Sequence, residues 1–140
     1  MKHYLRLLLA LLIIGCSSDD DTTTTKSNPN LIGTWKLIEQ LQDPGDGNGT
    51  FKAVTSDRTF TFNTENTVVV NGNICFMRVD VGDEISATYN MDANDASSGK
   101  ILTGTICNTS GFNLNYTIEG QFLIVSYPCI EACAQKFEKL

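Results

Sequence analysis

The sequence predicts a small all-β domain, folded as an antiparallel up-and-down β-barrel of eight or nine strands. Residues 112–118 alternate strictly between apolar and polar side chains, which is the period of a half-buried strand. Shorter segments of the same kind are separated by Gly- and Asn-containing turns, and no stretch of useful length has a helical period. Closing such strands into a barrel removes exposed edges. A two-sheet sandwich accommodates the same number of strands and stays open as the alternative.

The first fifteen residues have the layout of an export signal. Lys2 and Arg6 precede an apolar run of eight residues, and Gly15-Cys16 closes it. This pattern resembles a bacterial lipoprotein signal peptide with its lipobox, in which the small Gly15 suits the cleavage site and the Cys16 thiol receives a diacylglyceryl group. Eight residues are too few for a membrane span, which needs about 20. We therefore expect residues 1–15 to be removed and Cys16 to anchor the protein in a membrane.

Residues 16–30 contain no large apolar side chain, so they cannot offset the entropy lost on ordering. We expect a flexible tether. Its start, Ser17-Ser18 followed by three aspartates, resembles the export signal of surface lipoproteins of the Bacteroidetes group. The resemblance implies an outer-membrane lipoprotein exposed on the cell surface. A solvated acidic spacer is the alternative interpretation.

From residue 31 to residue 140 the chain consists of short β segments, which we interpret as one domain. The expected strands are residues 31–41, 59–62, 67–71, 85–89, 100–107, 112–118, 122–127 and 136–140. Asn71-Gly72 predicts a two-residue hairpin turn, and Gly120 predicts a second tight reversal. In the segment 100–107, Leu102 and Ile106 are expected to face inward.

Charge and composition exclude several functions. The mature chain has 8 basic and 16 acidic residues, a formal charge of −8, which argues against nucleic acid as a partner. The only histidine, His3, lies in the signal peptide, so the mature chain has none for a catalytic triad or a His-ligated metal. Asp43, Asp46 and Asn48 offer oxygens to Ca²⁺, but they suit a surface turn equally well. We expect no enzyme activity, no cofactor and no metal.

Four cysteines remain once Cys16 is lipidated, namely Cys75, Cys107, Cys129 and Cys133. An even number in a small exported domain favours two disulfides over free thiols. Three connectivities are open, and we prefer Cys75–Cys107 with Cys129–Cys133. A Cys₄ zinc site is the competitor, but the chain lacks paired Cys-x-x-Cys spacing.

Gly33-Thr34-Trp35 resembles the Gly-x-Trp opening of lipocalins, in which the tryptophan of the first strand plugs one end of the barrel. With segments 43–51, 71–75 and 127–133, residues 31–140 resemble the small lipocalin-like domain of Bacteroidetes lipoproteins. The chain lacks the Thr-Asp-Tyr pattern and the Trp-covering arginine of true lipocalins. The resemblance therefore implies the fold and names no ligand.

The expected interior is rich in aromatic side chains: Trp35, Phe60, Phe62, Phe112, Tyr116 and Phe122. An eight-stranded barrel holds either its own side chains or one small ligand. The first hypothesis is a lipid-anchored cell-envelope binding protein whose barrel holds a small apolar ligand. The alternative is a filled barrel that serves as a surface interaction or structural module for a protein or glycan partner. Loops such as residues 43–49 and 92–99 would then carry the function.

The anchor assignment is tested by Cys16→Ala. The variant should remain an unlipidated precursor, because the thiol that accepts the lipid is gone. Metabolic labelling with a palmitate analogue measures this directly, with the Cys129→Ala/Cys133→Ala protein as the control that keeps its label. A Cys16→Ala protein that is still labelled would refute the assignment.

Overall fold

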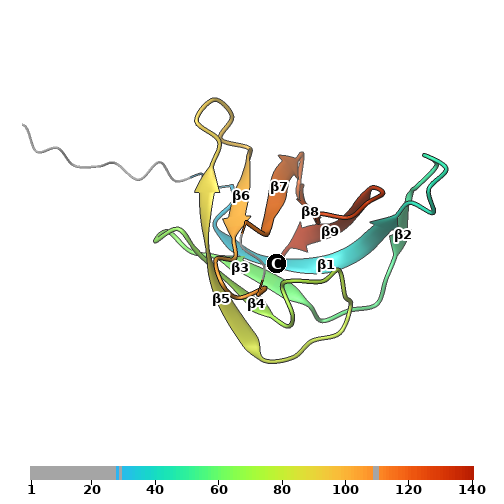
Figure 1. Cartoon of the computed structure of the whole chain (residues 1–140). Helices are drawn as coiled ribbons and strands as arrows, with labels where there is room; N and C mark the ends of the chain where they lie inside the picture. Colours follow the sequence, from blue (N-terminus) through green and yellow to red (C-terminus); the bar gives the residue numbers. More distant parts are fainter. Residues whose placement is uncertain (1–27, 29, 109–110) are drawn as a thin grey trace, which may run out of the picture.

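The computed structural model describes residues 28, 30–108 and 111–140, and this part of the chain is all-β (Figure 1). The predicted signal peptide, Cys16 and all of the tether except residues 28 and 30 lie outside the described residues. Within the described part, there is no helix long and apolar enough to cross a bilayer.

Nine strands follow one another along the domain. They are β1 (Gly33–Gln42), β2 (Phe51–Ala53), β3 (Thr59–Phe62), β4 (Thr67–Asn71), β5 (Glu84–Met91), β6 (Ser98–Leu102), β7 (Asn113–Glu119), β8 (Phe122–Ser126) and β9 (Cys133–Lys139). Each pairs antiparallel with its neighbour in the sheet, in the order β2-β1-β3-β4-β5-β6-β7-β8-β9. The predicted up-and-down arrangement is confirmed.

The sheet closes because β1 also pairs with β9, from Trp35 opposite Lys139 to Gln42 opposite Cys133. The first half of β1 pairs with β3 on its other side, and the second half pairs with the short β2. Eight strands therefore form a closed barrel, and β2 is an extra strand beside β1. This closure decides between the barrel and the sandwich in favour of the barrel.

Alternating side chains of all the long strands fill the interior. Its largest fully buried members are Trp35, Arg58, Tyr116, Phe60, Phe62, Phe137, Leu31, Leu37, Ile74, Ile101, Leu114 and Leu123. The pairing of β1 with β9 shifts register between Leu37 and Glu39, which marks a β-bulge. Leu37 faces inward, but the bulge turns Leu41 to the outside. The buried side chains of β1, Trp35 and Leu37, therefore both lie in its first half.

The two predicted turns have opposite outcomes. The reversal at Gly120 is confirmed, with β7 ending at Glu119, β8 starting at Phe122 and a φ of +62° at the glycine. The hairpin at Asn71-Gly72 is wrong, because residues 72–83 form a long loop before β5. The Asn71 amide is used elsewhere: it accepts from the Thr59 backbone N–H at 2.6 Å and donates to the Asp57 carbonyl at 2.9 Å.

Several expected strand limits also change. The segment 100–107 is a strand only to Leu102, and its buried residue is Ile101, whereas Ile106 is exposed in the following loop. The inward assignment of Leu102 is therefore wrong by one residue, and a shift of one residue along a strand moves a side chain to the opposite face. The inward assignment of Ile106 is wrong because the strand ends before it. The last strand starts at Cys133, three residues earlier than expected, because it pairs with β1 along its whole length.

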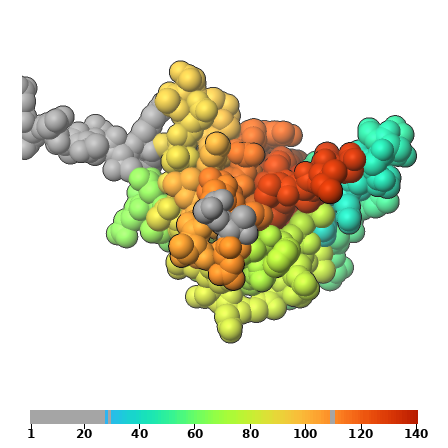
Figure 2. All heavy atoms as spheres, viewed as in Figure 1, coloured from blue at the N-terminus to red at the C-terminus, as the bar shows by residue number. Residues whose placement is uncertain are grey.

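The barrel has two different ends. At the tryptophan end, the indole N–H of Trp35 donates to the Leu31 carbonyl at 2.8 Å, and the Asn28 amide donates to the Ala96 carbonyl at 2.7 Å. The other end carries the β1–β2, β4–β5, β6–β7 and β8–β9 loops, and we call it the disulfide end. In the space-filling view, the β1–β2 loop projects from the barrel body beside the β8–β9 loop (Figure 2).

Gly99 in β6 tests the packing of the interior. A Cβ at this position would overlap the Asn90 carbonyl oxygen and lie 2.6 Å from Tyr116 Oη. Gly99→Ala should therefore lower the free energy of unfolding by about 1–3 kcal/mol, as overpacking does. Urea denaturation measures the loss, and Gly82→Ala, whose added Cβ would meet nothing closer than 3.8 Å, is the matched control. Equal stabilities of the two variants would contradict this packing.

Candidate binding surface at the disulfide end

Four of the six predicted interior aromatics lie in the buried core. Trp35, Phe60, Phe62 and Tyr116 are all at most 2% exposed. The rings of Phe62 and Tyr116 meet edge to face at 5.6 Å between centroids, and Tyr89 lies 5.1 Å from Phe62 and 6.3 Å from Tyr116. Aromatic pairs at such spacings and angles are in favourable contact. The side chains of the barrel thus fill the interior with one another.

The tyrosine hydroxyls in this cluster are also satisfied from within the chain. Tyr116 donates to the Asn90 carbonyl at 3.0 Å, and Tyr89 donates to the Asn63 carbonyl at 2.8 Å. Burial raises the pKa of both phenols above the ordinary value. Both groups are therefore neutral donors with partners in place, and they present no polar group toward a ligand.

The other two expected interior residues differ in their placement. Phe112, just before β7, is half-buried at the margin of the core. Phe122 is on the outer face, because Leu123 and Val125 are the inward residues of β8. There the Lys136 ammonium lies over the rings of Phe122, at 5.6 Å, and Phe51, at 4.3 Å. The assignment of Phe122 to the interior is wrong. Because β8 is apolar on both faces, its sequence does not alternate between apolar and polar residues and so does not show which face is inward.

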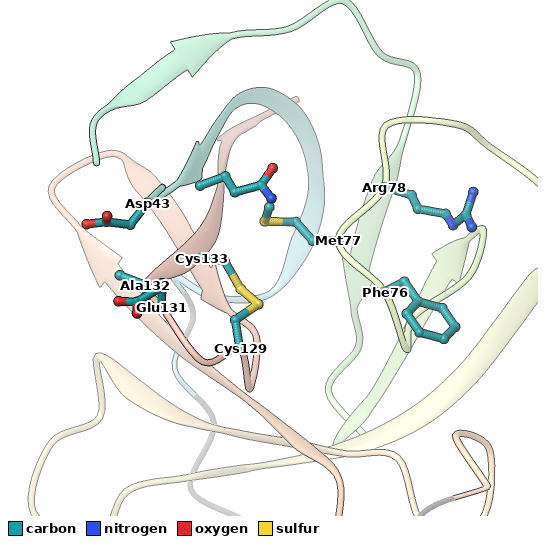
Figure 3. Close-up of a pocket in the computed structure, with 9 residues that line it drawn as sticks. Asp43, Phe76, Met77, Arg78, Cys129, Glu131, Ala132 and Cys133 are labelled. Carbon is teal, nitrogen blue, oxygen red and sulfur yellow. A yellow bond between two sulfur atoms is a disulfide. The ribbon is translucent and has the colours of Figure 1, made fainter. Parts of the chain in front are cut away.

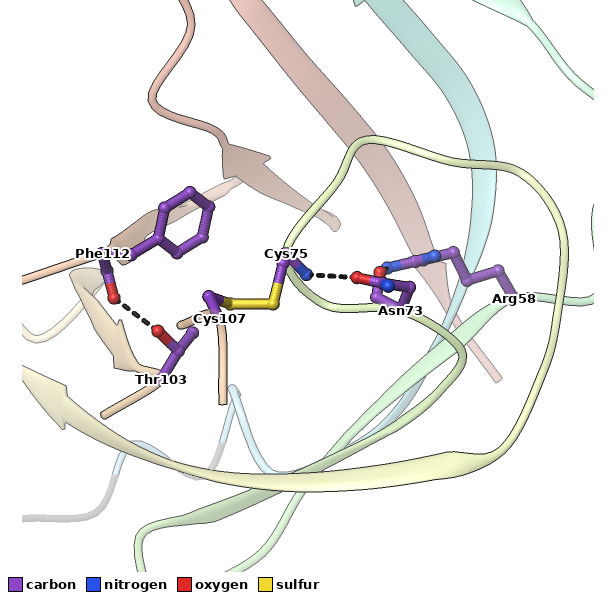
Figure 4. Close-up of a disulfide and its surroundings, with 6 residues drawn as sticks. All are labelled: Arg58, Asn73, Cys75, Thr103, Cys107 and Phe112. Atoms are coloured by element: carbon purple, nitrogen blue, oxygen red, sulfur yellow. Dashed lines mark hydrogen bonds between the residues drawn. A yellow bond between two sulfur atoms is a disulfide. The ribbon is translucent and has the colours of Figure 1, made fainter. Parts of the chain in front are cut away.

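Both disulfides lie at the disulfide end, and the preferred pairing is confirmed. Cys75 and Cys107 join the β4–β5 and β6–β7 loops with Cα atoms 5.4 Å apart (Figure 4). Cys129 and Cys133 close the β8–β9 loop with Cα atoms 6.1 Å apart. Three of the four loops at this end are therefore covalently restrained.

A cleft of about 610 Å³ opens between the β1–β2, β4–β5 and β8–β9 loops (Figure 3). It is lined by Gln42, Asp43, Phe76, Met77, Arg78, Cys129, Glu131, Ala132 and Cys133. The lining mixes apolar side chains with carboxylates, an amide and a guanidinium. In Figure 3, the Met77 side chain extends from the β4–β5 loop toward the Cys129–Cys133 disulfide, whereas the side chains of Phe76 and Arg78 are directed away from it.

Exposed apolar side chains gather at the same end. Among the described residues, the exposed large apolar side chains are Phe76, Val79, Val81, Ile106, Ile130 and Leu140. All but the C-terminal Leu140 belong to loops of the disulfide end. Phe76 is 60% exposed and Ile130 is completely exposed. Such a concentration is typical of an interaction surface, since scattered exposed apolar residues are the ordinary pattern.

The charged residues of these loops are mostly acidic. The described residues of the four loops include five carboxylates, at Asp43, Asp46, Asp80, Asp83 and Glu131, but only one cation, Arg78. The Asp43 carboxylate accepts backbone N–H groups from Gly45 at 2.8 Å and from three further loop residues. These bonds, chiefly that from Gly45, hold the pKa of Asp43 below its ordinary value.

The Asp43 contacts are those of a turn in the β1–β2 loop. Its oxygens are used by the backbone of the loop itself, as in an Asx-turn. Within the described residues, there is no group of three or more His, Cys, Asp or Glu side chains placed to hold a metal ion.

Sequence reasoning missed Phe76, Met77 and Arg78, which contribute most to one wall of the cleft. The expected strands leave residues 76–78 unassigned, between the segments 67–71 and 85–89. The available signal was Cys75 itself, because a half-cystine paired over 32 residues commits its neighbours to a restrained loop.

No family model matches the chain, and no curated protein matches it significantly.

The disulfides should differ in their contribution to stability. Cys75–Cys107 closes a separation of 32 residues and Cys129–Cys133 one of 4. On the loop-entropy model, replacing each pair by alanines should lower the free energy of unfolding by about 4 and about 2 kcal/mol respectively. Urea denaturation of the two double variants measures both losses. Equal losses, or a larger loss for the Cys129–Cys133 pair, would contradict the dependence of disulfide stabilisation on loop length.

Proposed function

We propose that this chain is a lipid-anchored binding module of the cell envelope, with a filled barrel and a protein-binding surface at its disulfide end. The observation that carries this proposal is the placement of the exposed apolar side chains. Five of them lie on the restrained loops of one end, led by Phe76 and Ile130. Loops held by a rigid scaffold are the usual location of binding residues.

The filled interior supports the binding of a partner outside the barrel over an apolar ligand within it. Phe62, Tyr89 and Tyr116 occupy interior space by mutual ring contacts, and the hydroxyl groups of the two tyrosines donate to backbone carbonyls. A ligand there would have to displace side chains packed at interior density. The interior ligand remains the competing hypothesis.

A protein suits this surface better than a glycan. Four of the five exposed apolar side chains are aliphatic: Val79, Val81, Ile106 and Ile130. Sugar sites need flat aromatic faces and dense hydrogen-bonding groups, whereas aliphatic loops bury well against another protein. The excess of carboxylates around them favours a partner with a basic rim, because opposite potentials steer association.

The position of the expected anchor agrees with this surface. Asn28, the first described residue, bonds to Ala96 at the tryptophan end of the barrel. The chain therefore leads toward Cys16 from that end, and the disulfide end lies opposite. The eleven residues between Cys16 and Asn28 span at most about 40 Å when extended. A flexible tether of this length, attached at the tryptophan end, would leave the disulfide end free to face away from the bilayer.

Site-specific photocross-linking in intact cells tests the proposal. A photoreactive amino acid at Ile130 should give a discrete protein adduct, because this side chain is the most exposed apolar group of the proposed surface. The same amino acid at the exposed Glu65, at the tryptophan end, should give none. Phe76→Ser should reduce the Ile130 adduct about tenfold or more, as the loss of an interface hot spot does.

Leu140→Ser is the matched control, since Leu140 is 74% exposed but lies outside the disulfide end. It should leave the Ile130 adduct unchanged. Absence of an Ile130 adduct, or equal adducts from Ile130 and Glu65, would overturn the proposed surface.

A further inference from the structure

The Cys129–Cys133 disulfide joins an exposed cysteine to a buried one. Cys129 is exposed in the β8–β9 loop, whereas Cys133 is 5% exposed and is the first residue of β9. Both line the cleft of Figure 3. Both also line a second hollow of about 360 Å³, which we call the outer groove and whose lining includes Leu41, Phe51 and Ile124. A small molecule can therefore reach Cys129 through either hollow.

The other disulfide of the chain provides a comparison. Cys75 and Cys107 are half-buried and pack against the core, and neither lines the cleft or the outer groove. Their bond closes a separation of 32 residues, whereas Cys129–Cys133 closes one of 4. A disulfide gains less stability from a short loop on the loop-entropy model, and exposed disulfides are the labile ones. The two bonds should therefore differ in reactivity toward thiols.

Opening the Cys129–Cys133 bond leaves the barrel closed. The Tyr127 backbone N–H donates to the Cys133 carbonyl at 3.1 Å, and the Asp43 backbone N–H donates to the Ala132 carbonyl at 2.9 Å. Cys133 also pairs with Gln42 across the β1–β9 ladder. These contacts belong to the backbone and do not require the S–S bond. The opening therefore requires movement of the β8–β9 loop alone.

The charge beside this disulfide is negative. Among the described residues that line the outer groove, Glu131 is the one with a charge. In the cleft, Asp43 adds a second carboxylate, whereas the Arg78 side chain is directed away from the disulfide (Figure 3). Carboxylates attract positively charged molecules and repel negatively charged ones. A thiol carried by a cation should therefore approach Cys129 faster than one carried by an anion.

We propose that Cys129 is a thiol-exchange site, at which a small cationic thiol forms a mixed disulfide. The thiolate of this molecule attacks Cys129 Sγ, where a new S–S bond forms while the Cys129–Cys133 bond breaks. Cys133 leaves with the electron pair as a thiolate and takes a proton from water. Its Sγ lies 3.7 Å from the Tyr127 carbonyl oxygen, which can accept a hydrogen bond from the resulting thiol.

A second molecule of the small thiol completes the exchange. Its thiolate attacks the sulfur of the first molecule in the mixed disulfide, and Cys129 leaves as a thiolate. Two small thiols are then oxidised to one disulfide, and Cys129–Cys133 is reduced to two thiols. This inference goes beyond the proposed function and does not depend on it, because the exchange is measured on the purified protein without a partner.

Cysteamine, a cationic thiol, tests the site on the purified, folded protein. After an acid quench, peptide mass spectrometry should find cysteamine on Cys129 and none on Cys133, with Cys75–Cys107 intact as the internal control. At equal thiolate concentration, the anionic mercaptoethanesulfonate should react about tenfold more slowly at low ionic strength. Added salt should remove this difference, since it screens exposed charges.

Two single variants test which sulfur is accessible. Cys133→Ala leaves the exposed Cys129 with a free thiol, and Cys129→Ala leaves the buried Cys133 with one. Cystamine, the disulfide of cysteamine, should modify the first variant about tenfold faster than the second or more, because exposure controls thiol reactivity.

Each outcome decides the proposal. Cysteamine on Cys133, earlier opening of Cys75–Cys107, or no adduct until urea unfolds the protein would overturn the site. Equal rates for cysteamine and mercaptoethanesulfonate at low ionic strength would overturn the proposed cationic ligand. If either variant fails to fold, the adduct map of the native protein decides alone, since it identifies the attacked sulfur without a substitution.

Discussion

The pairing of β1 with β9 is the constraint on which the rest of the structure depends. It runs from Trp35 to Gln42 and joins the two ends of the sheet, so an open meander becomes a closed barrel. The bulge between Leu37 and Glu39 lets the same strand serve two purposes. Its first half contributes Trp35 and Leu37 to the core. Its second half pairs with β2 and ends at Gln42, which lines the cleft.

Closure and filling together are the reason that we place the proposed binding surface at the barrel end. Eight strands enclose space for side chains or one small ligand, and the aromatic cluster around Phe62 and Tyr116 occupies that space. The four loops of the disulfide end are then the part of the fold in which the sequence can change without disturbing the packed interior. Cys75–Cys107 and Cys129–Cys133 restrain three of them, which would lower the entropy that the proposed partner must remove on binding.

The sequence predicted the fold wherever one face of a strand was polar. Residues 112–118 and the Phe60–Phe62 pair alternate, and their inward positions agree with the structure. Phe122 was misplaced because β8 is apolar on both faces. The hairpin at Asn71-Gly72 was misread because the Asn71 side chain binds residues 57 and 59, which are distant in sequence. The cleft was missed for the same reason, since it depends on contacts between loops that local pattern does not encode.

The central claim is that the barrel interior is filled by its own side chains. Native mass spectrometry of the protein purified from the cell envelope tests this most directly, because it weighs the folded chain with everything it holds. The account predicts the mass of the polypeptide with its covalent acyl groups and no apolar molecule that solvent extraction removes. A stoichiometric apolar ligand, released on extraction and rebound by the native protein, would contradict it.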